Sequence, residues 1–155
     1  MMKYIIFVLL IFFVTIPTLK ADVKKWQLEQ VGFLNIDRNE KDYGGFSGLV
    51  ISNEGTEALV VTDKSFFFVL ELRRDENDIL TGYSVIRKGR ILSSKGEHLN
   101  GRNTDSESIV IDENNNYYIS FESNHRIMMH AEVEEKGIFV PKHPMFRKLS
   151  VNKGI

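Results

Sequence analysis

The stretch NTDSESIVIDENNNYYISFESNHRI, residues 103–127, predicts a β-hairpin whose open end is acidic. Two short apolar runs flank residues 112–116, which are residue types that adopt turn conformations and hydrogen-bond their own main chain. Pairing the two strands about this turn places Glu107 opposite Phe121, and Glu122 follows one step further. Because both strands end there, we expect the two glutamates to emerge at the same end of the hairpin.

Three carboxylates, those of Asp105, Glu107 and Glu122, are therefore expected to gather at this end. Two unit charges about 5 Å apart repel by roughly 3 kcal/mol at an effective dielectric constant of 20. One acid can keep its proton at neutral pH, which suits acid–base catalysis. A hard cation such as calcium can bind, or Arg126 can fold back and pair with the acids. These interpretations stay open, and the last one makes the cluster purely structural.

A second segment has the same pattern. SGLVISNEGTEALVVTD, residues 47–63, aligns with ESIVIDENNNYYISFE, residues 107–122, at an offset of about 60 residues. Each copy has an apolar strand, a polar turn, a second apolar strand and a final acid, which is Asp63 in the first copy. Self-similarity at this spacing, with about four strands per unit, is typical of β-propeller blades. A chance likeness between two apolar hairpins is the alternative.

The chain after the N-terminal region is expected to be β-structure throughout, because short apolar runs alternate with turn residues. We predict an all-β fold, a partial β-propeller of about two to three blades. A polar loop, SSKGEHLNGRNT at residues 93–104, interrupts the pattern, and loops of this length usually have a function or are mobile. The expected strands are residues 26–34, 46–51, 58–62, 66–72, 80–86, 107–111, 117–121 and 126–133.

The first 21 residues have the pattern of a secretory signal peptide. Lys3 precedes an apolar run at residues 4–16 that ends at Pro17, and Ala21 suits the position before a cleavage site. The run is shorter than the roughly 20 residues of a membrane span. We therefore predict an exported protein, periplasmic or secreted, with no stable membrane span after cleavage. A retained N-terminal anchor is the alternative.

Composition excludes several classes of protein. The 20 basic and 21 acidic residues are interspersed without a basic stripe, which argues against a nucleic-acid partner. The absence of cysteine excludes disulfides and thiolate metal sites. His98 and His143 lack the spacing of zinc ligands. His125 can contact a phosphate or act as a base, although a lone histidine at the edge of a strand is more often plain surface. Oligomeric state is not predicted.

Two segments resemble the esterase-like phytase family. GGFSGLVISNEGTEALVVTDKS, residues 44–65, is similar to that family's leucine-serine-glycine-leucine opening, which is followed by serine-aspartate. DSESIVIDENNNYYISFESNHRI, residues 105–127, is similar to its aspartate-x-glutamate-glycine-leucine segment, which continues to a glutamate and an arginine-isoleucine pair. The resemblance extends over residues 44–133. The matching positions are Asp63, Asp105, Glu107, Glu122 and Arg126.

The resemblance implies a hydrolase of phosphate or carboxylic esters of small molecules, with calcium as its cofactor. Glu107, Glu122 and Arg126 would then be catalytic, and the arginine would stabilise negative charge that develops on the ester oxygen. The implied metal ligands are Asp63, Asp105, Glu107 and Glu122. The alternatives are a non-catalytic propeller that binds a ligand or a protein partner, and a calcium-dependent lactonase-like propeller.

The expected domains are a signal peptide at residues 1–21 and a phytase-like β-propeller domain at residues 22–155. Ser108 departs from the family pattern, because a glycine usually stands there. Family members are about twice this length, so we expect the propeller to be truncated at its C-terminus, which leaves sheet edges open.

Overall fold

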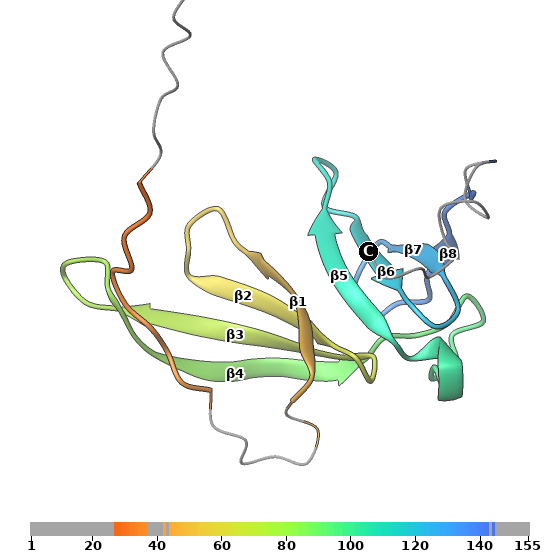
Figure 1. Ribbon diagram of the computed structural model, residues 1–155, viewed down its shortest axis with the longest axis horizontal. Helices are drawn as coiled ribbons and strands as arrows, with labels where there is room; N and C mark the ends of the chain where they lie inside the picture. Colours follow the sequence, from red (N-terminus) through yellow and green to blue (C-terminus); the bar gives the residue numbers. More distant parts are fainter. Residues whose placement is uncertain (1–26, 37–41, 43, 143, 145–155) are drawn as a thin grey trace, which may run out of the picture. The chain divides into compact units, whose positions relative to one another are not determined.

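The computed structural model describes residues 27–36, 42, 44–142 and 144, and its described part is all-β (Figure 1). The chain forms two compact units, residues 1–30 and 31–155, and both sheets belong to the second. Each sheet is antiparallel with its four strands in sequence order. Sheet 1 contains β1 (Phe46–Ile51), β2 (Glu57–Thr62), β3 (Phe66–Arg74) and β4 (Leu80–Arg90). Sheet 2 contains β5 (Ser106–Ile111), β6 (Tyr117–Phe121), β7 (Arg126–His130) and β8 (Ile138–Phe139).

The prediction of an all-β fold is confirmed, and so are the expected strands from residue 46 onward, with shifted ends. β4 continues to Arg90, and β7 ends at His130 before the predicted end at residue 133. The two-residue β8 was not predicted. The polar loop before β5 contains a short 3-10 helix, η1 (Gly101–Asn103). No helix within the described ranges has the length and apolar character needed to cross a membrane. The predicted signal peptide lies outside the described residues.

The predicted strand at residues 26–34 is wrong for its described residues, 27–34, which pair with no strand. Ile36, just after this segment, packs against the apolar face of sheet 1, and Leu34 lines the same surface. A strand needs a sheet edge that supplies hydrogen-bonding groups. Leu34 and Ile36 lie over a face of the sheet, where no such groups are available. Leu28, Val31 and Phe33 remain exposed.

The hairpin of β5 and β6 contains one irregularity that the sequence did not reveal. Ile111 pairs with Tyr117 as predicted, but Ser106 and not Glu107 pairs with Phe121. The prediction that Glu107 lies opposite Phe121 is therefore wrong by one residue. Glu107 is the extra residue of a β-bulge, which inserts one residue into one strand and redirects its side chain.

The predicted repeat is a repeat of backbone structure. The hairpin of β1 and β2 has the same bulge, and Ser47 is its extra residue. Just beyond each hairpin, the N–H of Asp63 donates to the carbonyl of Gly45, and the N–H of Glu122 donates to that of Asp105, both at 2.8 Å. The open ends of the two hairpins are thus closed in the same way.

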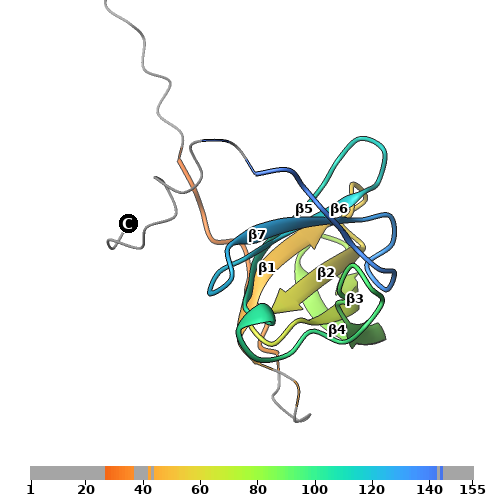
Figure 2. The ribbon, with the colours of Figure 1, turned by 90° about the vertical axis from the view of Figure 1, so that its right-hand side faces the viewer.

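The main hydrophobic core lies between the two sheets, and Figure 2 shows β5 to β7 lying across the strands of sheet 1. We call the faces that meet there the inner faces. Each fully buried large apolar side chain stabilises the fold by about 1.5–3 kcal/mol. The inner face of sheet 1 supplies Leu59, Val61, Phe67 and Val69, that of sheet 2 supplies Ile109, Ile119, Phe121 and Met128, and the connecting segments add Ile91, Leu99 and Val133.

The backbones of β1 and β5 approach each other closely at Gly48. A Cβ atom added there would lie 2.9 Å from the nitrogen of Ile109 and 3.0 Å from the Cα of Ser108. A residue with a side chain therefore requires the strands to move apart. Next to it, the Ser47 hydroxyl donates to the Ser106 carbonyl at 2.5 Å. These contacts fix the open end of the second hairpin against the first.

Candidate functional site

Three carboxylates meet at the open end of the second hairpin. One oxygen from each of Asp105, Glu107 and Glu122 lies within 4.8 Å of the others. Asp105 precedes β5, Glu107 occupies the bulge and Glu122 follows β6. The prediction that these acids gather at one end is confirmed, and we call them the acidic cluster.

Buried hydroxyl groups position the segment that carries the cluster. Ser106 is fully buried, and its hydroxyl donates to the carbonyl of Thr62 at the end of β2. The hydroxyl of Ser65, also fully buried, donates to the carbonyl of Thr104. Because a buried polar group without a partner costs about 1–3 kcal/mol, these bonds favour one position of the segment around Asp105.

The cluster changes the proton affinity of Glu107. The pKa of Glu107 is raised above its ordinary value, first by partial desolvation and then by the negative charges of Asp105 and Glu122. The charge of Asp63, from the first hairpin, adds to the rise, and so does a hydrogen bond between the side chains of Glu107 and Asp105. The cluster therefore attracts either a proton or a cation.

Arg126 is buried and binds main-chain carbonyl groups. Its guanidinium donates to the carbonyl of Asn124 at 2.9 Å and to that of Asn103 at 2.5 Å. It also lies 3.8 Å from the ring centre of Phe121. Burial lowers its pKa, although an arginine keeps its charge in proteins. These contacts tie the turn after β6 to η1, while the catalytic role of Arg126 stays a prediction.

A polar pocket of about 350 Å³ adjoins the cluster, lined by Arg102, Asp105, Glu122, Ser123 and His125. Arg102 donates to the Ser123 carbonyl at 3.3 Å, and the Ser123 hydroxyl donates to Asp105 at 2.6 Å. Sequence reasoning did not select Arg102 or Ser123. The signal that pointed to Arg102 was the long polar loop at residues 93–104.

The donor set of the acidic cluster fits a hard divalent cation. Ligand oxygens lie about 2.3–2.6 Å from a bound calcium ion, so two of them are no more than about 5 Å apart. The three oxygens of the cluster meet this limit. Asp63, the fourth predicted ligand, is exposed on the first hairpin and takes part through its charge on Glu107. The cluster can thus bind a metal ion.

A protein-family model described as Phytase-like, "Esterase-like activity of phytase", matches residues 41–155. The chain belongs to the Phytase-like family. The matched segment contains both sheets and the acidic cluster, so the resemblance inferred from the two hairpins is confirmed. No curated protein and no solved structure matches the chain significantly. At the level of the family, the match supports a hydrolase with esterase-like activity on a small-molecule substrate.

Proposed function

We propose that this Phytase-like chain is an exported hydrolase of phosphate or carboxylic esters, with calcium bound by the acidic cluster. The observation that carries the proposal is the convergence of three carboxylate oxygens within 4.8 Å inside the segment matched by the family. The apolar run at residues 4–16 supports export to the periplasm or the medium.

Each residue of the site has a role that its position supports. Asp105, Glu107 and Glu122 would hold the cation, which when bound polarises an ester oxygen. Where no cation is bound to it, Glu107, whose pKa is raised, is suited to accept a proton from the attacking water. Arg102 and His125 line the adjoining pocket, where they can donate hydrogen bonds to an anionic substrate.

We also propose that the two sheets are neighbouring blades of a β-propeller. Each is a four-stranded antiparallel meander, and the two stack through their faces. The bulge and the closing hydrogen bond recur in both sheets, as expected for repeated blades. In such a fold the open ends of successive hairpins surround a central mouth, where the acidic cluster would face the substrate.

Turnover by the purified full chain tests this function. The substrates are p-nitrophenyl phosphate and p-nitrophenyl acetate, each in excess CaCl2 or in EDTA. We expect turnover that EDTA abolishes, with kcat/KM reduced about 100-fold by Glu107→Gln or Glu122→Gln. Glu113→Gln, in the turn at the other end of the same hairpin, is the matched control and should leave turnover unchanged.

Three other results would contradict the proposal. Turnover that neither EDTA nor Glu107→Gln reduces would show that the acidic cluster takes no part in the reaction. Hydrolysis of lactones alone would favour a lactonase-like propeller. No turnover, together with no effect of calcium on thermal stability, would favour a propeller that binds a ligand or a protein partner.

A further inference from the structure

The contact between the sheets joins two different kinds of face. The pairing registers make Ile119 and Met128 of sheet 2 equivalent to Val60 and Phe68 of sheet 1. In sheet 2, the face that carries this pair packs against sheet 1. In sheet 1, the equivalent face points away from sheet 2, and we call it the outer face of sheet 1. It is therefore built like a face that the same chain buries elsewhere.

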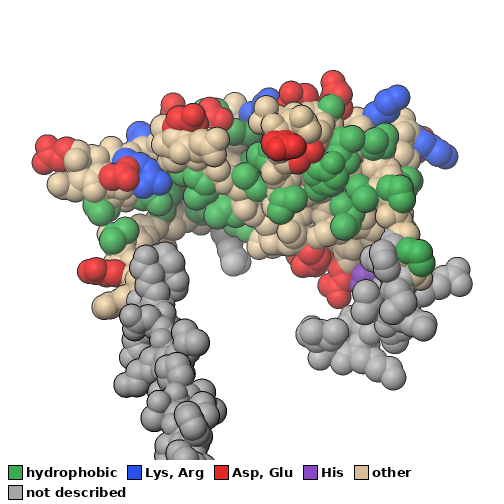
Figure 3. Space-filling view, turned by 90° about the horizontal axis from the view of Figure 1, so that it is seen from above, with side chains coloured by type: hydrophobic (Ala, Val, Ile, Leu, Met, Phe, Trp, Pro, Cys, Tyr) green, Lys and Arg blue, Asp and Glu red, His purple; other side chains and the backbone are tan. Residues whose placement is uncertain are grey.

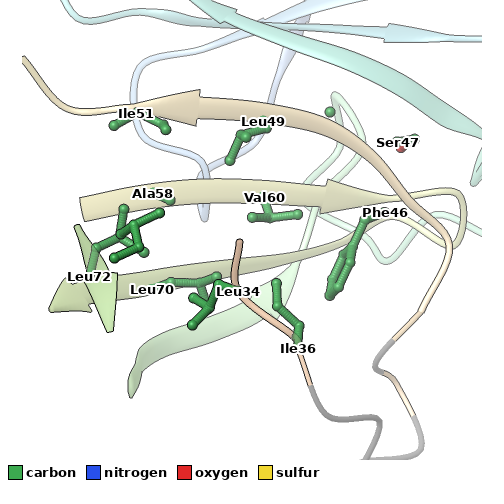
Figure 4. A pocket seen from close by; sticks show the side chains of 12 residues that line it. Leu34, Ile36, Phe46, Ser47, Leu49, Ile51, Ala58, Val60, Leu70 and Leu72 are labelled. Atoms are coloured by element: carbon green, nitrogen blue, oxygen red, sulfur yellow. The ribbon is translucent and has the colours of Figure 1, made fainter. Parts of the chain in front are cut away.

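The outer face of sheet 1 is apolar and grooved. A second hydrophobic cluster lies on it, made of Ala58, Val60, Phe68 and Leu70. Beside this cluster is a groove of about 380 Å³, whose sides include β1 and the segment that carries Leu34 and Ile36 (Figure 4). Leu49 and Ile51 on β1 remain exposed at this groove. Exposed apolar surface of this kind marks an interaction site in soluble proteins.

The outer face of sheet 2 is the complementary kind of face. Val110 and Ile127 on it are equivalent in register to Val50 and Phe67, which face sheet 2 from the inner face of sheet 1. Val110, Ile127 and Ile138 are exposed. Figure 3 shows hydrophobic side chains gathered over part of the visible surface instead of scattered singly. The described part of the chain thus carries both halves of a contact that it already makes internally. The half on sheet 2 is exposed, whereas the half on sheet 1 is covered in part by the segment of Leu34 and Ile36 and is exposed at Leu49 and Ile51.

We propose that copies of this chain associate head to tail. The outer face of sheet 1 in one copy packs on the outer face of sheet 2 in the next, which repeats the contact between the inner faces. Such a heterologous contact either closes into a ring or continues as a filament.

Complementation between two variants tests this arrangement. Leu49→Glu places a charge on the outer face of sheet 1, and Val110→Glu does so on the outer face of sheet 2. Both side chains are more than half exposed, at 58% and 56%, so the substitutions should leave folding intact, which circular dichroism checks. Ile86→Glu is the matched control, because Ile86 is 53% exposed on the outermost strand β4. Sedimentation velocity of the full chain, as its host processes it, measures association.

The expected result is specific to head-to-tail contact. The unaltered chain and Ile86→Glu should associate, and each of the other variants should lower the association constant about 100-fold, because a buried unpaired charge is costly. An equimolar mixture of Leu49→Glu and Val110→Glu should form a dimer, since each supplies the face that the other lacks. A monomeric unaltered chain, association that neither variant weakens, or a mixture that stays monomeric would each overturn the proposal.

Discussion

The two hairpins share a backbone and differ in chemistry at equivalent positions. The bulge of β1–β2 holds Ser47, whose hydroxyl is used in the hydrogen bond to Ser106 of sheet 2. The bulge of β5–β6 holds Glu107, which is exposed. The repeated backbone places the two bulge residues at equivalent positions. Ser47 lies in the contact with the neighbouring sheet, whereas Glu107 lies outside it and can carry a charge.

The residues before the two hairpins, Gly45 and Asp105, are also equivalent in backbone position and differ in chemistry. Gly45 has a φ of 65°, and a Cβ atom there would lie 2.1 Å from a carboxylate oxygen of Asp63. A side chain is therefore excluded from the first hairpin, whereas the equivalent Asp105 adds a carboxylate to the second. As a result, the first hairpin keeps one acid and the second brings three together.

The substitution with the largest expected effect on stability is at Gly48, where the two hairpins are in contact. Gly48→Val should lower the free energy of unfolding by about 3 kcal/mol, because its side chain meets the backbone of β5. Ser108→Val alters the equivalent, exposed position of sheet 2 and should cost no more than about 0.5 kcal/mol. Urea unfolding at concentrations that keep the chain monomeric measures both. Equal costs would mean that the close approach does not stabilise the fold.

A smaller loss is expected when the buried hydroxyl beneath the acidic cluster is removed. Ser106→Ala leaves the carbonyl of Thr62 without this donor and should cost about 1–2 kcal/mol. The exposed Ser94, changed to alanine, is the control and should have little effect. The same unfolding measurement applies, and a neutral Ser106→Ala would show that this bond does not position the segment.

A pH-dependent loss of stability is expected at His130, which is equivalent in register to Leu70 of sheet 1. His130 is fully buried, its Nδ1 lies 2.9 Å from the carbonyl of Glu135, and desolvation lowers its pKa. The unfolded chain therefore takes up a proton first as pH falls below about 6.5. Stability should be complete above that pH and decrease by about 1 kcal/mol between pH 7.5 and 5.5.

His130→Leu, which copies the residue of sheet 1, should remove this part of the pH dependence. Glu107, whose pKa is raised, contributes in the opposite sense, so the difference between the two chains isolates the histidine. Urea unfolding at several pH values makes the comparison. Parallel pH profiles for the two chains would contradict the assignment.

The smallest expected effect is that of the Asp63 charge, on the first hairpin, on the pKa of Glu107 in the second. Asp63→Asn should lower the pKa of Glu107, but by less than Asp105→Asn does, because Asp105 contributes the larger charge interaction. An NMR titration of the Glu107 carboxyl carbon in metal-free buffer measures both shifts. A larger shift from Asp63→Asn would reverse the order that the structure gives.

The sequence predicted the features that depend on local pattern. Alternating apolar runs and the turn at residues 112–116 were enough to place β5 and β6 and to bring Glu107 and Glu122 to one end. The one-residue bulge that holds Glu107 was missed, because it depends on the closing bond from Glu122 to Asp105 and on the contact with β1.

Features that depend on distant partners could not be predicted. Pairing of Arg126 with nearby acids was one of three open interpretations of the cluster, and the guanidinium instead donates to the carbonyls of Asn103 in η1 and of Asn124. Arg102 reaches the pocket because that loop folds back over the turn after β6. The apolar pattern at residues 26–34 predicted a strand because sequence periodicity does not show whether a sheet edge is available to pair with it.

Calorimetric titration of the full chain with CaCl2 tests most directly whether the second hairpin is an ion site. The unaltered chain and Glu113→Gln should bind about one ion per chain, because three carboxylates at the cluster supply hard oxygen ligands. Glu107→Gln should weaken binding by about tenfold or more. Binding of equal strength in Glu107→Gln, or no binding to the unaltered chain, would contradict the assignment of the acidic cluster as a metal site.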